Sequence, residues 1–252
     1  MGRKGEGGHL KRKPAPKLWP IHRKEAVWTV MPKPGPHSLS RSLPLLLIVR
    51  DILGFAKTAK EAKSILSQGK ISVNGKVRRD ERFLVGMMDI VSIPDANASY
   101  LVLPSKKGLF LHTIGSNDAT FKLSRIEDKT VVKGGNVHLD LHDGSNFLID
   151  MNAPQNLEKE NYHTLDVLKL SIPDRELLGY MKLTEGSPAI VVGGKNMGQV
   201  GKVVTIEKQA DKKRRNLLVT LKGEKGNQFQ TILDFVFVLG DTDSSISLPE
   251  VD

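Results

Sequence analysis

The sequence predicts an α+β fold made of several small domains, and three observations lead to this prediction. Two adjacent helical patterns, each with start and stop signals, lie between residues 43 and 69. From about residue 96, short apolar segments alternate with turn residues, as is typical of all-β modules. The length of 252 residues allows one large domain or two to three small ones. We expect a basic N-terminal extension (1–42), a helix-pair and hairpin domain (43–95), a β-rich central domain (96–176), a small β-barrel (177–240) and a C-terminal tail (241–252).

The composition excludes several classes of protein. With 39% hydrophobic and 26% charged residues, the chain has the balance of a globular protein. Its longest apolar run, residues 43–49, contains a proline and is far shorter than the ~20 residues that a bilayer core requires. No apolar segment of the secretory type follows the basic N-terminus. Because cysteine is absent, disulfides, thiolate nucleophiles and Cys-type zinc sites are excluded, and we expect a cytosolic protein without a membrane partner.

The positive charge is concentrated at the start of the chain. The formal net charge is +10, and the first fifty residues hold 11 basic and two acidic side chains. Residues after 100 hold 19 basic and 20 acidic side chains. A field of one sign at one end favours a polyanionic partner, either nucleic acid or an acidic membrane surface. The alternative is a tail that only improves solubility.

Residues 1–42 are rich in Gly, Pro, Lys and Arg. Such a segment buries too little apolar surface to offset the entropy lost on ordering, so we expect it to be mobile when alone. Trp19 and Trp28 lie within it. Their rings either stack on unpaired bases or anchor the extension on the folded part of the chain, and the sequence leaves both alternatives open.

Two short helices are predicted next. The first extends from Leu43 to Gly54, with Ser42 as its cap and Pro44 at the tolerated first position. The second begins with a capping box over residues 58–61 and ends at Gly69. Three lysines fall on the outer side of this second helix: Lys57, Lys60 and Lys63.

A β-hairpin is predicted directly after the helix pair. Asn74 and Gly75 form the dipeptide that a two-residue hairpin turn favours, because both positions take positive φ. Arg78 and Arg79 lie on the return strand. We expect these arginines and the helix lysines to line one basic concave surface that neutralises phosphates, with an ordinary solvated face as the alternative.

The rest of the chain is predicted to be β-rich. Strands are expected in the central region over 100–103, 108–112, 121–123, 137–141, 147–149 and 167–172, and residues 152–161 are expected to form a polar loop. In the last module, strands are expected over 189–192, 202–206, 217–221 and 229–232. The glycine-bearing turn at 193–201 between two of these strands resembles the KOW motif, which implies an SH3-like barrel.

Tests for catalytic and metal-binding motifs give a negative result. A phosphate-binding loop is excluded, because Ala189 stands where its first glycine is required and Asn196 where its hydroxyl is required. Strand alternation places His138, Asp140 and His142 on one face, but this is only three ligands, and a solvated strand face explains them as well. We therefore expect no catalytic residues, no metal and no cofactor.

Motifs along the chain carry a resemblance to known families. The string Ser64–Val77, preceded by a helix pair and followed by Asp89-Ile90-Val91, resembles the alpha-L RNA-binding motif. Gly86 and Asp89 are separated by two residues, whereas the commoner form of that motif has a Gly-Asp pair. With this motif and the strings listed next, the chain resembles the archaeal and eukaryotic small-ribosomal-subunit protein family of the S-four-e type. The strings are His9-Leu10-Lys11-Arg12, Gly35-Pro36-His37 and the tail Ile246-Ser247-Leu248-Pro249.

This resemblance implies a non-catalytic structural component of the small ribosomal subunit. Its expected partners are the ribosomal RNA of that subunit and neighbouring ribosomal proteins, with no small-molecule substrate, and its affinity for RNA should fall with salt. The residues expected to contact RNA are Arg3, Lys4, Lys11, Arg12, Lys13, Arg23, Lys24, Arg41, Lys57, Lys60, Lys63, Lys70, Asn74, Lys76, Arg78, Arg79, Lys195 and Asn196.

Two other functions remain as alternatives. Pseudouridine synthases also carry the alpha-L motif, so an RNA-modifying enzyme is one, although the β modules leave little room for a catalytic domain. A translation or transcription factor is the other, and it depends on the KOW resemblance alone.

Overall fold

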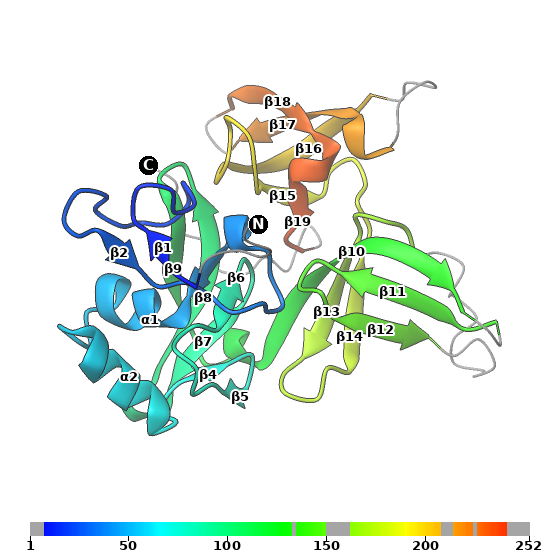
Figure 1. Ribbon diagram of the computed structural model, residues 1–252. Coiled ribbons are helices and arrows are strands. Elements are labelled where there is room, and N and C mark those ends of the chain that lie inside the picture. The colour runs from blue at the N-terminus through cyan, green and yellow to red at the C-terminus, as the bar shows by residue number, and fades with distance from the viewer. Residues whose placement is uncertain (1–7, 133–134, 150–161, 208–213, 224–225, 241–252) are drawn as a thin grey trace, which may run out of the picture. The chain divides into compact units, whose positions relative to one another are not determined.

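The computed structural model describes residues 8–132, 135–149, 162–207, 214–223 and 226–240, and it is mostly β-structure (Figure 1). The chain divides into two compact units. The first contains residues up to 103 together with 107–113, and the second contains 104–106 and the residues from 114 onward. Short 3-10 turns occur at η1 (Leu39–Arg41), η3 (Pro94–Ala96), η4 (Asp118–Thr120), η7 (Arg214–Asn216) and η8 (Leu233–Phe235).

The first unit is built on a five-stranded sheet in the order β5-β4-β7-β8-β9. Its strands are β4 (Ser72–Val73), β5 (Lys76–Val77), β7 (Ile90–Ile93), β8 (Ala98–Ser105) and β9 (Gly108–Ile114). The pairs β4–β5, β4–β7 and β7–β8 are antiparallel. The strands predicted at 100–103 and 108–112 are therefore present, and both lie in the sheet of the first unit.

The first predicted helix begins later than expected. Ser42–Pro44 form a strand, β3, that pairs with β6 (Leu84–Gly86), and the helical turn α1 covers only Leu45–Leu47 before the π-helical segment η2 (Ile48–Ile52). The predicted Ser42 cap was wrong, because the N–H groups of Leu45 and Leu46 instead donate to the carbonyls of Phe83 and Glu81, at 2.9 and 3.0 Å. Free donors at the start of this helix are thus satisfied by a neighbouring segment.

The second helix and the hairpin are confirmed. Helix α2 (Ala59–Ser67) begins with the predicted capping box, in which the Thr58 hydroxyl accepts from the Glu61 N–H while the Glu61 carboxylate accepts from the Thr58 N–H. Asn74 and Gly75 have φ values of 50° and 73°, as the turn between β4 and β5 requires. Both predictions rested on interactions between residues close in sequence.

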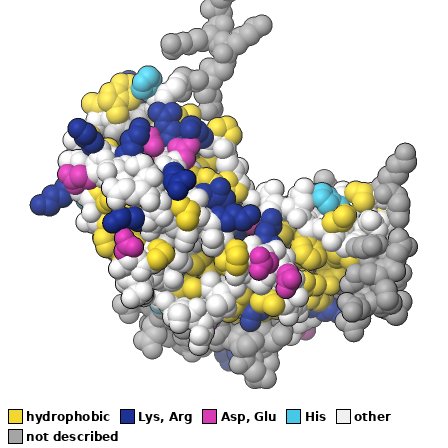
Figure 2. All heavy atoms as spheres, turned by 90° about the horizontal axis from the view of Figure 1, so that it is seen from below, with side chains coloured by type: hydrophobic (Ala, Val, Ile, Leu, Met, Phe, Trp, Pro, Cys, Tyr) yellow, Lys and Arg dark blue, Asp and Glu magenta, His cyan; other side chains and the backbone are white. Residues whose placement is uncertain are grey.

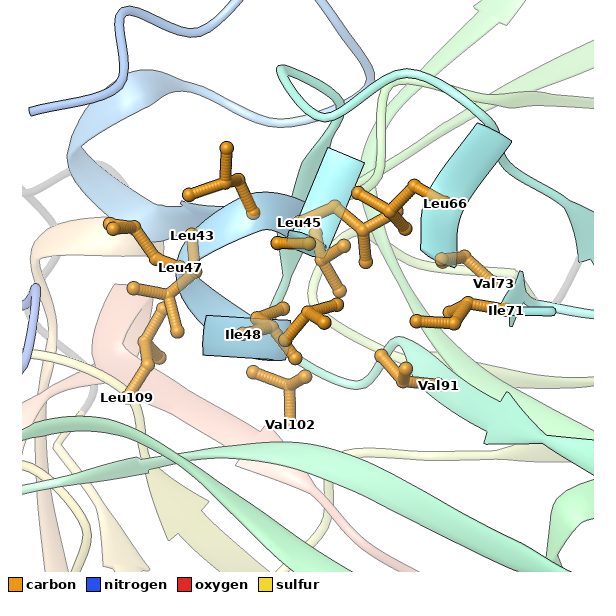
Figure 3. Close-up of a cluster of buried hydrophobic side chains, with 14 of the residues drawn as sticks. Leu43, Leu45, Leu47, Ile48, Leu66, Ile71, Val73, Val91, Val102 and Leu109 are labelled. Carbon is orange, nitrogen blue, oxygen red and sulfur yellow. The ribbon is translucent and has the colours of Figure 1, made fainter. Parts of the chain in front are cut away.

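The core of the first unit joins the helices to the sheet. Figure 3 shows side chains from β3, α1, α2, β4, β7, β8 and β9 gathered into one cluster of buried hydrophobic residues. Leu43, Leu45, Leu47 and Ile48 are at most 1% exposed. The short segment that contains them is therefore buried on all sides rather than along one stripe.

The extension packs on this core over its described residues. Strands β1 (Leu10–Lys11) and β2 (Trp28–Thr29) pair antiparallel, and Trp19 is 2% exposed and donates from Nε1 to the carbonyl of Ser42 at 2.7 Å. Over the described residues 8–42, the extension thus makes defined contacts with the first unit, where the composition had led us to expect a mobile segment. Trp19 takes the anchoring role, whereas Trp28 is 55% exposed.

The second unit contains two five-stranded antiparallel sheets. The order of the first is β12-β11-β10-β13-β14, built from β10 (Phe121–Val131), β11 (Val137–Leu141), β12 (Asn146–Ile149), β13 (Val167–Ser171) and β14 (Leu177–Met181). Four of these strands were predicted, and β14 was missed. The loop expected at 152–161 lies outside the described residues.

The other sheet has the order β18-β17-β16-β15-β19. Its strands are β15 (Pro188–Val191), β16 (Val200–Ile206), β17 (Leu218–Gly223), β18 (Gln228–Ile232) and β19 (Val236–Val238). The four predicted strands are confirmed within a few residues. Gly201 is required by the packing of this sheet, because a Cβ there would lie 2.7 Å from the carbonyl oxygen of Lys222.

Candidate nucleic-acid interface

Basic side chains are in excess on the first unit. Residues 8–103 contain 17 Lys and Arg and seven Asp and Glu. On the face drawn in Figure 2, Lys and Arg side chains gather over this unit, with a few Asp and Glu among them. The expected contact residues that are exposed are Lys11, Lys13, Lys24, Arg41, Lys57, Lys60, Lys63, Lys70, Lys76, Arg79 and, in the second unit, Lys195. This distribution suits a polyanionic partner.

Two arginines of the extension form hydrogen bonds within the protein. Arg12 is 7% exposed, donates to the carbonyl of His22 at 2.7 Å and forms an ion pair with Glu25 at 3.0 Å. Arg23 donates to the carbonyls of Arg12, Lys13, Ala15 and Pro16. These guanidinium groups donate to backbone carbonyls that regular secondary structure does not pair, so they stabilise the fold of the extension.

Arg79 and the C-terminal end of α2 lie together. A Cβ added to Gly69, just after the helix, would come within 3.5 Å of Nε and Nη2 of Arg79, so the guanidinium covers this position. Arg78 instead lies over the ring of Phe83, with 4.4 Å between Cζ and the ring centroid. Both arginines follow the return strand, which ends at Val77, and the structure brings only Arg79 to the helix that carries the exposed lysines.

Asn74 is engaged in a buried polar network. Its Nδ2 donates to Oδ1 of Asp89 at 2.8 Å, and its Oδ1 accepts from the N–H of Ile90 at 2.9 Å. Oδ2 of Asp89 accepts from the N–H of Gly86 and lies 2.8 Å from Nε2 of His37. The side chain of Asn74 therefore fixes the hairpin against β7, and the two extra residues between Gly86 and Asp89 form a turn in which Met88 has a φ of 62°.

Several exposed lysines have acidic neighbours. Lys33 lies 2.6 Å from Asp80, Lys63 lies 3.4 Å from Glu81 and Lys70 lies 3.2 Å from Asp95. Burial of Asp80 opposes its ionisation, but hydrogen bonds from Lys33 and from the N–H of Arg82 hold its pKa below the usual range. Exposed pairs of this kind contribute only about 0–1 kcal/mol, so a phosphate can replace the carboxylate at small cost.

The N-terminus of α2 combines lysines with an ionised glutamate. Hydrogen bonds from the N–H of Lys57, then from the Thr58 hydroxyl and N–H, lower the pKa of Glu61. Lys57 and Lys60, which both precede Glu61 in the sequence, are exposed. The Glu61 carboxylate accepts from the backbone N–H groups of Lys57 and Thr58, directly before the helix, and this leaves the two ammonium groups available for an external anion.

In the second unit, Lys195 is exposed but the side chain of Asn196 is used internally. Nδ2 of Asn196 donates to the carbonyl of Gln230 at 3.0 Å and ties the glycine-bearing turn to β18. Sequence reasoning missed Lys202 and Lys222, which are exposed and directly opposite each other on β16 and β17. The only sequence signal for the exposure of these two lysines was the alternation of polar and apolar residues along the strands.

Two predicted positions are not described by the structure, and four exposed basic residues were not predicted. Arg3 and Lys4 lie outside the described residues. Exposed basic residues of the first unit that were not predicted are Lys17, Lys33, Arg82 and Lys107.

His138, Asp140 and His142 do not converge on one point. Nδ1 of His138 lies 3.6 Å from Oδ1 of Asp140, but Nδ1 of His142 accepts from the N–H of Arg125 and its ring packs edge-on against Phe237. Across the described ranges, no group of three or more His, Cys, Asp or Glu side chains is arranged to hold a metal ion. Among the helices of the described residues, none is both long and apolar enough to cross a membrane.

Family models match three successive parts of the chain. Residues 4–40 match the RS4NT (NUC023) domain, residues 45–91 match the S4 domain, and residues 96–177 match Ribosomal family S4e. The S4-domain match thus covers α1, α2 and the β4–β5 hairpin, where the exposed lysines and Arg79 lie.

Curated relatives are similar over nearly the full length. The small ribosomal subunit protein eS4 of Desulfurococcus amylolyticus is 50% identical over 251 residues, which is 99% of either chain. The protein of the same name from Staphylothermus marinus is 48% identical with the same coverage. Among solved structures, the 30S ribosomal protein S4e from Thermoplasma acidophilum superimposes with a TM-score of 0.66 at 30% identity, covering 81% of this chain and 98% of that one.

Proposed function

The chain belongs to ribosomal family S4e, and we propose from this that it is a structural constituent of the small ribosomal subunit that binds ribosomal RNA. The observation that carries the proposal is the 50% identity to a small ribosomal subunit protein over 99% of both chains. A similarity of this extent covers the extension, the S4 domain and the second unit together.

The first unit supplies the main RNA-binding surface in this proposal. Lys57, Lys60, Lys76 and Arg79 are exposed around α2 and the hairpin, and the extension adds Lys11, Lys13 and Lys24. Lysine and arginine side chains that replace counterions at phosphates supply affinity without base specificity. Recognition is then by the shape of folded RNA, which is how proteins generally contact RNA helices.

The last sheet of the second unit contributes a further contact in this proposal. Its five antiparallel strands and the close approach of Gly201 to Lys222 support an SH3-like barrel of the KOW type. Lys195 on the glycine-bearing turn and the Lys202–Lys222 pair are exposed basic groups on it.

We propose a non-catalytic role in the cytoplasm, with neighbouring ribosomal proteins as further partners. The family to which the chain belongs is described as a ribosomal family. The polar networks found around Asp89 and Arg125 are hydrogen-bonded within the protein. These observations support assembly and scaffolding as its contribution.

Co-sedimentation and crosslinking test the proposal. We expect the native protein to sediment with the small subunit at one copy per particle, to remain after a high-salt wash, and to crosslink to its RNA through the first unit. Release of the protein by the salt wash would favour a translation factor, and base modification in ribosomal RNA incubated with the purified protein would favour an enzyme. Quantitative recovery away from ribosomes would disprove the proposal.

A further inference from the structure

The outward face of the β1–β2 ribbon presents an indole ring among basic groups. Trp28 lies opposite Lys11 in the register of the two strands and is 55% exposed. The Lys11 ammonium lies 5.8 Å from the centroid of the Trp28 ring. The imidazole of His9 lies 5.6 Å from it at an interplanar angle of 57°, so it borders the indole rather than stacking flat upon it.

Hydrogen bonds from two arginine side chains stabilise the β1–β2 ribbon that carries Trp28. Arg12 donates from Nη1 to the carbonyl of His22 and from Nε to the carbonyl of Trp28, at 2.7 and 3.4 Å, and its guanidinium pairs with Glu25. Arg23 in turn binds the carbonyl of Arg12 at 3.0 Å. A ligand that meets this surface therefore does not have to order the backbone, which lowers the entropic cost of binding.

The two tryptophans of the chain have opposite environments. Trp19 is 2% exposed and its Nε1 is bound to the carbonyl of Ser42, so it contributes to the core. Trp28 is not part of the buried cluster around Leu43 and Leu45 and leaves more than half of its surface to solvent. A large apolar ring on a positively charged surface suits a ligand that is both flat and anionic.

We propose that Trp28 is a stacking platform for an unpaired base of ribosomal RNA, with Lys11 at the adjacent phosphate. This inference rests on the proposed function. Single-stranded nucleic acid is bound by aromatic rings flanked by cations, because every base offers a π-face and every nucleotide a charge. A base within a duplex has no free face, so the site selects loops, bulges or ends.

The platform is tested by titrating the full-length protein with RNA at low ionic strength. The probes are a single-stranded RNA oligomer of mixed sequence, the same oligomer carrying abasic nucleotides, and a duplex of equal length. The variants are Trp28→Ala, Trp28→Phe and the matched control Val27→Ala, which truncates the neighbouring apolar residue that is 63% exposed. The readouts are quenching of tryptophan fluorescence and the Kd from filter binding.

We expect the single strand, but neither the abasic strand nor the duplex, to quench the emission. Trp28→Ala should weaken binding of the single strand by about 5- to 150-fold, the range measured for loss of one stacked base. Trp28→Phe should retain most of the affinity, because a phenyl ring can still stack. It should lose the quenching, because the remaining Trp19 is buried. Unchanged emission of Trp19 shows that the variants are folded.

Three results would overturn the platform: an unchanged Kd for Trp28→Ala, equal quenching by the duplex, or an equal loss of affinity for Val27→Ala. In each of these cases binding of ribosomal RNA by the whole protein would persist, and the proposed function would stand. Failure of the wild-type protein to bind ribosomal RNA at all would instead remove the proposed function, and the platform with it.

Discussion

Nε2 of His37 lies 2.8 Å from Oδ2 of Asp89, and their side chains are 5% and 1% exposed. His37 comes from the extension, whereas Asp89 precedes β7 and also accepts hydrogen bonds from Asn74 and from the N–H of Gly86. One buried carboxylate therefore joins the extension, the hairpin turn and the end of β6. A group in this position holds the extension, the hairpin and β6 in a fixed arrangement.

Replacement of Asp89 should destabilise the first unit strongly. Asp89→Ala removes the acceptor of the Asn74 amide and the Gly86 N–H and the partner of His37, and each buried polar group left unsatisfied costs about 1–3 kcal/mol. Urea unfolding followed by the fluorescence of the buried Trp19 measures the effect. The control is Asp95→Ala, whose exposed pair with Lys70 is worth about 0–1 kcal/mol. Similar midpoints for the two variants would show that the network contributes little.

A methyl group at Gly86 should clash with His37. A Cβ at this position would lie 2.3 Å from Cγ and Nδ1 of the imidazole, so the ring must move and the bond to Asp89 must break. We expect Gly86→Ala to cost about 1–3 kcal/mol, as overpacking generally does. Gly35→Ala, whose nearest contact is an ordinary 3.5 Å, is the matched control. Combining Gly86→Ala with His37→Ala should cost less than the sum of the single changes, and strict additivity would argue against the clash.

The lysines near α2 should contribute to the salt dependence of RNA binding. Lys57→Ala/Lys60→Ala removes two exposed cations, and the slope of log affinity against log salt should decrease by about 2 if both contact phosphates. Lys182→Ala, an exposed lysine of the second unit, should leave the slope unchanged. Filter binding to ribosomal RNA over a range of salt gives both slopes. An unchanged slope in the double variant would exclude these lysines from the interface.

The second unit should lose stability in acid through Asp143. Burial opposes ionisation of Asp143, but the ammonium of Lys122, 2.7 Å away, and the Ser145 hydroxyl hold its pKa well below the usual range. Because the pKa is lower in the folded than in the unfolded state, the ionised carboxylate stabilises the fold above the ordinary value of about 4, and this contribution disappears as the pH falls below it.

The test is the urea midpoint measured by circular dichroism from pH 7 down to pH 2. Asp143→Asn should lower stability at pH 7, because it leaves the buried Lys122 without its counterion, and should flatten the decline below about pH 4. Asp174→Asn, an exposed position in the same unit, should keep the wild-type profile. A wild-type profile in Asp143→Asn would show that this carboxylate does not govern the acid sensitivity.

Features that depend on neighbouring residues were predictable from the sequence. The capping box at 58–61 and the Asn74–Gly75 turn need only residues close together in the chain, and both occur as predicted. The start of the first helix was not predictable, because its free donors are satisfied by Phe83 and Glu81, almost forty residues later. Residues 42–44 therefore form a strand paired with β6, although their sequence is typical of a helix start.

The candidate interface shows the same division. Charge and residue type correctly indicated which unit carries the excess of basic residues, but they do not distinguish a guanidinium exposed to solvent from one used internally. Arg12 and Arg23 bind backbone carbonyls of the extension, and Asn74 binds Asp89. Each of these assignments depends on partners that only the fold brings together.

Arg125 has a consequence for synthesis of the chain. Its buried guanidinium donates to the carbonyls of Asp234 and Val236, which follow it by 109 and 111 positions. While the polypeptide is still emerging, these two acceptors do not yet exist for it. The second unit can therefore reach its final packing only after nearly every residue has been translated. In a nascent chain interrupted before residue 234, Glu127 can pair with the guanidinium, but Nη1 of Arg125 lacks its two backbone acceptors.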